Sequence, residues 1–256
     1  MKRILTAFVL LCLLLLPGCA EKNDRISEIK KRGVLCVGVK SDVPRFGFLN
    51  RDTNEYEGLE IDIARALAKD TLGDETAVSF VPVTAQTRDN LLNNREIDLI
   101  IATFTITEER KKTHNFSEPY YTDEIGFLVK KESGIQSMAD MNGKLVGAAH
   151  SSTAFNELES GEISTQSTFT HKGFANYPDL KSALTTGKID VFAADKSILY
   201  GYVDDNTLLL DEGFKPQPYG IATRLDDKEF AKYIDEQLQK MKTEGTLDKI
   251  LNAWIQ

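Results

Sequence analysis

Short apolar segments alternate with amphipathic segments along most of the chain. Continuous apolar runs at 34–39, 99–102 and 191–194 are typical of strands that are buried on both faces of a sheet. Between the first two runs, residues 59–72 place apolar side chains at helical spacing and end before Gly73, which predicts a helix. This alternation predicts an α/β fold with parallel-rich sheets that carry helices on both faces.

The same alternation restarts once, which predicts two lobes. An extended segment at 124–131 leads to a new series of strands and helices after Gly143, and a second extended segment at 215–223 leads back to amphipathic helices. Two crossings between lobes form a natural hinge for closure on a ligand in the cleft between them. The predicted division is lobe 1 at 34–123 with 220–256 and lobe 2 at 124–219.

The N-terminus has the pattern of a secretion signal. A short basic start is followed by a 13-residue apolar run at 4–16. At about 1.5 Å per residue, this run is too short to span a hydrocarbon core of about 30 Å. The motif Leu-Pro-Gly-Cys at 16–19 resembles a lipobox, so residues 1–18 are predicted to be a lipoprotein signal peptide and Cys19 to carry lipid. Residues 19–33 then form a tether and a first helix. The alternative is an ordinary signal peptide with an incidental cysteine.

Charge and cysteine content exclude several classes of function. The net charge of −8 becomes −10 when residues 1–18 are removed, which argues against nucleic acid or an anionic membrane surface as a partner. Cys36 is then the one cysteine of the folded body, and its apolar neighbours predict a small buried side chain. The sequence shows no spacing typical of a metal or cofactor site, so neither is predicted.

One stretch, 97–110, carries a buried strand into a polar, threonine-rich segment. Thr103 and Thr105 follow the strand, and Thr107 stands at the N-cap position of a predicted helix that contains Arg110. Ligands of open α/β sheets bind beyond the carboxyl ends of the strands, and a guanidinium can hold a carboxylate through two parallel hydrogen bonds. The stretch therefore predicts a carboxylate-binding site. The alternative is a solvated helix face, because two lysines follow the arginine.

The segment 94–102 is echoed at 186–194. Both segments begin as a helix end and a polar turn, continue with Ile-Asp, and finish as a buried strand that closes on alanine. The first strand leads to Thr103 and the second leads to Asp195. Hydroxyls and a cation on one side of a cleft, with a carboxylate on the other, match the paired charges of an α-amino acid. The alternative for Asp195 is an N-cap of the next helix.

The segment 102–121, ATFTITEERKKTHNFSEPYY, is similar to the signature of family 3 of the bacterial extracellular solute-binding proteins, which serve polar amino-acid ABC transporters. The resemblance extends from Val34 to Trp254 and is closest to the aspartate/glutamate-binding, Campylobacter adhesin-like branch. It implies a two-lobed type II periplasmic binding protein fold with a ligand cleft between the lobes. It also implies a monomer, lipid-anchored outside the cytoplasm, with ABC permease subunits as partners.

The resemblance further implies roles for individual residues. Arg110 would hold the α-carboxylate of the ligand, and Asp195 would hold its α-ammonium. Thr105 and Ser152 would add hydroxyl or N–H donors, and Thr103 would add a backbone contact.

An acidic ligand carries a second carboxylate, which needs a further cation. Lys40 and Arg88 match positions that aspartate/glutamate-binding relatives fill with lysine and arginine, and the alternative is that both are surface cations. Tyr219 is expected either to line the cleft or to pack in the hinge. His150 and Arg45 are weaker candidates that belong at the rim.

These features predict a substrate-binding lipoprotein that captures aspartate or glutamate and delivers it to a permease. The alternatives are a binding protein for glutamine or another polar amino acid, and a surface adhesin or sensor that uses the same fold. An enzyme, like the dehydratases related to this family, would need a general acid or base beyond Asp195, and the sequence places none.

Overall fold

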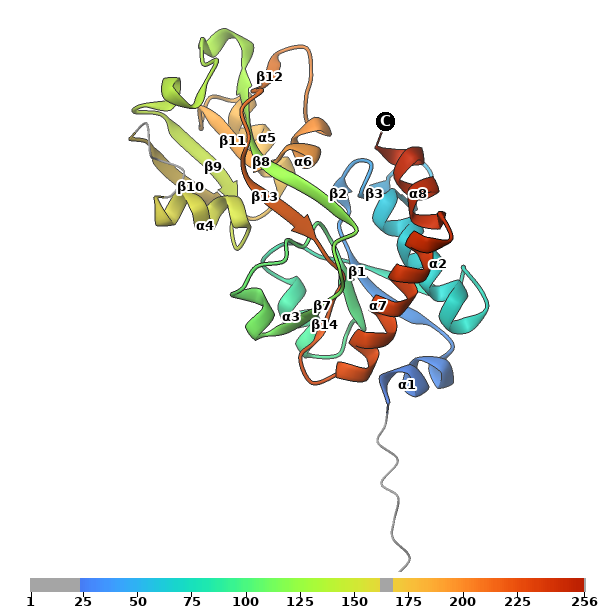
Figure 1. The fold of residues 1–256 in the computed structure, drawn as a ribbon. Helices are drawn as coiled ribbons and strands as arrows, with labels where there is room; N and C mark the ends of the chain where they lie inside the picture. Colours follow the sequence, from blue (N-terminus) through green and yellow to red (C-terminus); the bar gives the residue numbers. More distant parts are fainter. Residues whose placement is uncertain (1–23, 162–167, 256) are drawn as a thin grey trace, which may run out of the picture.

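The computed structural model describes residues 24–161 and 168–255. The predicted signal peptide at 1–18 and the predicted lipid site at Cys19 lie outside these residues. No helix of the described chain has the length and apolar character needed to cross a membrane. The described residues form two larger β-sheets, each packed against helices, and one small sheet (Figure 1).

The first sheet is built from segments near both ends of the described chain. In spatial order it contains β5 (Val78–Pro82), β1 (Leu35–Val39), β6 (Leu99–Ile101), β14 (Ala222–Arg224) and β7 (His114–Phe116). β1 pairs in parallel with β5 and β6, whereas β14 is antiparallel to both β6 and β7. The chain therefore returns to this sheet after building the second one.

The second sheet has β8 as its longest strand. In spatial order it contains β10 (Thr170–Phe174), β9 (Leu145–Ala149), β11 (Val191–Asp195), β8 (Tyr121–Lys130) and β12 (Thr207–Leu209), with β13 (Phe214–Tyr219) also paired to β8. β9 pairs in parallel with β10 and β11, and β8 is antiparallel to its three partners. The small sheet contains β2 (Asp42–Val43), β3 (Gly47–Asn50) and β4 (Glu55–Glu57).

Several of the described helices begin or end where the sequence supplies caps. Asp24 accepts a hydrogen bond from the backbone N–H of Ile26, and Asn176 accepts one from Asp179 at 2.8 Å. Gly73 has φ 82° and ends the predicted 59–72 helix as a left-handed C-cap. The helices with the first sheet are α1 (Arg25–Arg32), α2 (Leu59–Leu72), α3 (Arg88–Asn93), α7 (Lys228–Thr243) and α8 (Thr246–Trp254), and those with the second are α4 (Thr153–Ser160), α5 (Tyr177–Thr185) and α6 (Lys196–Tyr200).

Two paired strands connect the two sheets. β8 leaves the first sheet and β13 returns to it, and the two strands run side by side from the Tyr121–Tyr219 pair to Phe214 (Figure 1). These two strands cover most of the segments at 124–131 and 215–223 that were expected to be extended. A paired, two-stranded connection constrains how the two sheets can move relative to each other.

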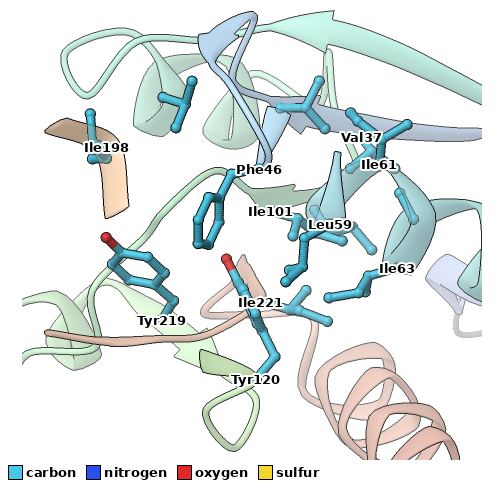
Figure 2. Close-up of a cluster of buried hydrophobic side chains, with 14 of the residues drawn as sticks. Val37, Phe46, Leu59, Ile61, Ile63, Ile101, Tyr120, Ile198, Tyr219 and Ile221 are labelled. Carbon is cyan, nitrogen blue, oxygen red and sulfur yellow. The ribbon is translucent and has the colours of Figure 1, made fainter. Parts of the chain in front are cut away.

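A single apolar cluster extends from the first sheet to α6 beside the second. Figure 2 shows Phe46 at its centre, with Tyr219 and Tyr120 on one side and the aliphatic side chains of α2 on the other. The rings of Phe46 and Tyr219 are 6.0 Å apart in an edge-to-face arrangement. Ile198 of α6 belongs to the same cluster, so apolar contacts join the two halves of the molecule in this closed arrangement.

Two local predictions were wrong. The predicted helix after Thr107 is only a three-residue 3-10 turn, η1 (Arg110–Lys112). The Thr107 hydroxyl does accept a hydrogen bond from the Arg110 N–H at 3.1 Å, but the chain enters β7 at His114 and leaves no room for a longer helix. Cys36 is partly buried, not fully, because β1 exposes one position of its apolar run. Two further 3-10 turns are η2 (Lys131–Ser133) and η3 (Met138–Met141).

Candidate ligand-binding site

A small pocket lies between the two sheets. Six of the eight predicted ligand-binding residues line it, and Lys40 and Tyr219 do not. From the side of the first sheet the lining comprises Ala85, Arg88, Thr103, Thr105 and Arg110, and from the side of the second it comprises Ser152, Thr153, Ala154, Tyr177, Ala194 and Asp195.

The Arg110 guanidinium connects the two sides of the pocket. Nη1 donates to the carbonyl of Thr105 at 2.8 Å, and Nη2 donates to the carbonyl of Ser151, in the loop after β9, at 3.2 Å. Burial and the neighbouring Arg88 lower the pKa of Arg110 to about 9, so its charge persists at neutral pH. Two carbonyls fix the plane of this cation, and its remaining donors are available to an anionic group.

A second guanidinium shares the same aromatic ring. The Arg88 guanidinium lies 3.7 Å from the ring centroid of Phe104, and that of Arg110 lies 4.7 Å from it. Arg88 is 4% exposed and donates through Nη1 to the carbonyl of Ala102 at 3.1 Å. Its Nε is buried without a hydrogen-bond partner among the described residues. Two adjacent buried cations favour the binding of an anion.

The opposite charge in the pocket comes from the end of β11. Asp195 is 5% exposed, and its Oδ2 accepts a hydrogen bond from the Tyr219 hydroxyl at 2.5 Å. Burial and, after it, the nearby Asp123 raise the pKa of Asp195 to about 7, against the lowering effect of the Tyr219 hydrogen bond. Asp195 occupies the N-cap position of α6, as the alternative expected, but its side chain makes no capping hydrogen bond. An ammonium group would restore the ionised form of this carboxyl.

Tyr219 supports the pocket from behind. It is fully buried between Asp195 and the ring of Phe46, and its pKa is raised well above the ordinary value by burial. Its hydroxyl also lies 3.2 Å from Asp123 Oδ2, and the shorter contact assigns its one proton to Asp195. Tyr219 is absent from the pocket lining and packs on Phe46, a position that agrees with the hinge-packing alternative.

Lys40 is held away from the pocket lining by two neighbours. Its Nζ lies 3.0 Å from Asp42 Oδ1 and 4.8 Å from the ring centroid of Tyr177. Burial lowers its pKa, and Asp42 opposes that effect. The Lys-Ser-Asp spacing at 40–42 was the sequence signal for this pair. Lys40 is not among the residues that line the pocket, so the lining does not support a direct contact between Lys40 and a ligand carboxylate.

The threonines of the pocket are tied to the return strand. Thr105 and Thr153, on opposite sides, both donate their hydroxyl protons to Oε1 of Gln217, at 2.9 and 2.6 Å. The Thr105 hydroxyl is therefore already engaged, which leaves its backbone for a ligand. Ser152 accepts from the N–H of Phe155 at 3.1 Å and caps α4. The amide oxygen of Gln217, in β13, therefore holds a threonine from each side of the pocket.

A further contact joins α6 of the second half to the small sheet. The hydroxyl of Tyr202, after α6, donates to the carbonyl of Asp42 in β2 at 2.5 Å. His150 and Arg45 are exposed, as expected of rim residues. Sequence reasoning missed Tyr177 and Gln217, whose isolated positions gave no signal. It also missed Glu60, although the sequence shows this charged residue between the apolar residues at the start of α2.

Comparison with known proteins agrees with this architecture. Residues 35–256 match the family described as bacterial extracellular solute-binding proteins, family 3. The chain is 40% identical to the ABC transporter glutamine-binding protein GlnH of Bacillus subtilis, with 92% of this chain and 86% of that protein covered. It is 41% identical to a glutamine-binding protein of Geobacillus stearothermophilus, with coverage of 83% and 80%.

A solved structure gives the same picture of the fold. An ancestral arginine-binding protein bound to glutamine superposes with a TM-score of 0.78 at 34% identity, covering 88% of this chain and 98% of that one. The predicted type II periplasmic binding protein fold is confirmed by such neighbours. The predicted aspartate/glutamate-binding, adhesin-like branch is not supported by these relatives.

Proposed function

The chain belongs to family 3 of the bacterial extracellular solute-binding proteins and serves an amino-acid ABC importer, and we propose that its ligand is glutamine. The observation that carries this proposal is the enclosure of Arg110 and Asp195 in one pocket, contributed from opposite sides. A free α-amino acid carries the complementary carboxylate and ammonium on one carbon atom. The same pair of groups is absent from sugars and simple anions.

We propose that Arg110 holds the α-carboxylate and that Asp195 holds the α-ammonium. The guanidinium plane of Arg110 is already fixed by two carbonyls, which reduces the entropy lost on binding. The backbone N–H of Thr105 and the hydroxyl proton of Ser152 complete the carboxylate end, since the N–H groups of Thr103 and Ser152 already donate to Glu60 and to the carbonyl of Ala149. Because the two charged residues belong to different lobes, the ligand would favour the closed arrangement, with 34–123 and 220–256 closing on 124–219.

Three observations favour a neutral side chain on the ligand. Lys40 is already neutralised by Asp42, so it does not add a free positive charge. The pocket walls offer hydroxyl, amide and carbonyl groups, which suit an amide that both donates and accepts. The two relatives with about 40% identity are both described as glutamine-binding.

An acidic amino acid is the second candidate. It is favoured by Arg88, whose buried Nε lacks a hydrogen-bond partner among the described residues and could meet a second carboxylate. Isothermal titration calorimetry of the purified protein against the twenty amino acids separates the two. We expect glutamine to bind tightest. Tighter binding of glutamate or aspartate would overturn the glutamine assignment, and failure of every amino acid to bind would overturn the whole proposal.

We further propose that the protein acts outside the cytoplasm as a monomer, anchored through a lipidated Cys19, and that it delivers its ligand to permease subunits. The support is the apolar run that ends in the lipobox-like motif at 16–19. Replacing Cys19 with alanine should release the protein from the membrane fraction or leave its signal uncleaved. Unchanged processing and membrane association would contradict the anchor.

A further inference from the structure

Glu60 is a buried carboxyl group directly behind the pocket. It lies in the first turn of α2, where its side chain is fully buried among apolar residues. Its Oε1 accepts two hydrogen bonds of 2.5 Å, from the backbone N–H of Thr103 and from the hydroxyl of Tyr120. Its Oε2 is buried without a hydrogen-bond partner among the described residues. An ionisable group is costly to bury, so this one needs a compensating charge.

The compensating charge lies at the other end of the same peptide group. Arg88 donates to the carbonyl of Ala102, and Glu60 accepts from the N–H of Thr103, so a cation and an anion hold one peptide bond from its two ends. Thr103 has φ 43°, which is unfavourable for a β-branched residue and requires support from its surroundings. Arg88 and Thr103 both line the pocket. The peptide at 102–103 therefore links Glu60 to the pocket surface.

Glu60 also completes the charge balance of the closed site. Lys40 is paired with Asp42; of the other charged side chains, Arg88, Arg110 and Asp195 line the pocket and Glu60 lies behind it, while Asp89 and Asp123 act on Arg88 and Asp195 from outside the lining. A zwitterion with a neutral side chain leaves this balance unchanged, whereas a second carboxylate adds a negative charge that only Arg88 could meet. The positive charge of Arg88 is already offset in part by the negative charge of Glu60.

We propose that Glu60 is a positioning residue that determines the charge selectivity of the pocket, by holding the peptide at 102–103 and offsetting Arg88 so that a neutral ligand side chain is preferred over a carboxylate. The inference rests on the proposed amino-acid-binding function and deepens it. It assigns selectivity to a residue that does not touch the ligand.

The test compares the ratio of glutamate to glutamine dissociation constants in three proteins, measured by calorimetry at pH 8. Glu60→Gln keeps the shape of the side chain and removes its charge, and should shift the ratio toward glutamate by about tenfold or more. Asp62→Asn is the matched control, because it removes the same charge from the same helix at a side chain that contacts Arg65 and Trp254 instead. It should leave the ratio unchanged.

The possible outcomes separate this inference from the function itself. An unchanged ratio in a folded, ligand-binding Glu60→Gln protein would overturn the role of Glu60, and so would an equal shift in Asp62→Asn. Failure of the wild-type protein to bind any amino acid would instead overturn the proposed function. Glu60→Asp, which keeps the charge, should retain the wild-type preference even where both affinities fall.

The pH profile of the wild-type protein is an independent test that needs no variant. Burial raises the pKa of Glu60 to about 7, against the lowering effects of Tyr120, the Thr103 N–H, Lys40 and Arg88, which are the groups that face it. As the pH falls from 8 to 6, Glu60 takes up a proton and the selectivity ratio should move toward glutamate. Asp195 titrates in the same range but meets the α-ammonium of both ligands, so its effect cancels in the ratio. A flat ratio would contradict the inference.

Discussion

Each half of the internal repeat contains an aspartate with the same structural role, and the two halves differ beyond it. Asp98 Oδ2 accepts a hydrogen bond from the backbone N–H of Cys36 at 2.8 Å, and Asp190 Oδ2 accepts one from Leu145 at 2.8 Å. Each aspartate therefore ties its own strand, β6 or β11, to the neighbouring parallel strand. The Ile-Asp echo in the sequence marks how both sheets are built, and it carries no ligand chemistry itself.

The chemistry begins beyond the shared part, and there the two sides differ. After β6, Thr103 exposes a backbone peptide whose N–H is held by Glu60, and Glu60 accepts from Tyr120. At the end of β11, Asp195 faces the pocket and accepts from Tyr219. Both sides contain a tyrosine–carboxylate pair at 2.5 Å, but the carboxylate is behind the pocket on one side and in it on the other. The same type of pair therefore holds the backbone in one lobe, and in the other lobe it presents a carboxylate to the pocket.

The strongest test of the shared part compares two aspartates. Asp98 is 1% exposed and also forms ion pairs with Arg25 and Arg32. Asp98→Asn should lower the free energy of unfolding by about 3–5 kcal/mol, the cost of breaking a buried pair. Asp190→Asn, at a partly exposed side chain, should cost only about 1 kcal/mol. Equal losses in denaturant unfolding would show that the two halves are energetically equivalent.

The second test concerns the charged residues that face the ligand. Arg110→Ala should weaken glutamine binding by about 2–5 kcal/mol, because it leaves a buried α-carboxylate unpaired. Lys111→Ala is the control, since Lys111 is exposed and pairs with Glu108. Calorimetry should show near-wild-type affinity in the control. Retained binding in Arg110→Ala would contradict the assignment of the carboxylate to this side.

The third test uses pH to separate the two carboxyl groups. Asp195, with a pKa raised to about 7 by burial and Asp123, is ionised above pH 7 in the unliganded protein. Below that pH it must lose a proton before it can pair with an ammonium, so affinity should fall by about tenfold per pH unit. Measuring this in Glu60→Gln removes the contribution of Glu60. Constant affinity between pH 8 and 5 in that variant would contradict the role of Asp195.

The smallest expected effects compare the two supporting tyrosines. Tyr219→Phe removes the hydroxyl that orients Asp195 and should weaken binding of all amino acids by about 0.5–1.5 kcal/mol. Tyr120→Phe should have less effect, because Glu60 keeps its bond to Thr103. A larger loss from Tyr120→Phe would reverse the assignment of direct and indirect roles.

The sequence by itself determined the elements and the main charged pair. Buried runs predicted β1, β6 and β11, the spacing before Gly73 predicted α2, and the repeat pointed to Thr103 and Asp195 as the ends of equivalent strands. These inferences succeed because strand burial and helix caps are local properties, which depend on residues only a few positions apart in the sequence. The same locality explains why six of the eight proposed ligand contacts lie in the pocket lining.

Only the tertiary structure decided how these groups are supported and which cations remain free. Asp42 is only two positions from Lys40, but the ring of Tyr177 lies beside Lys40 only in the folded chain. From the sequence, Tyr219 could either line the cleft or pack in the hinge, and the return of β13 placed it behind Asp195, 24 positions away in the chain. Burial and long-range pairing set the charge that each group presents, because they depend on neighbours that are distant in sequence. Local patterns cannot encode those neighbours, so selectivity is a property of the folded chain.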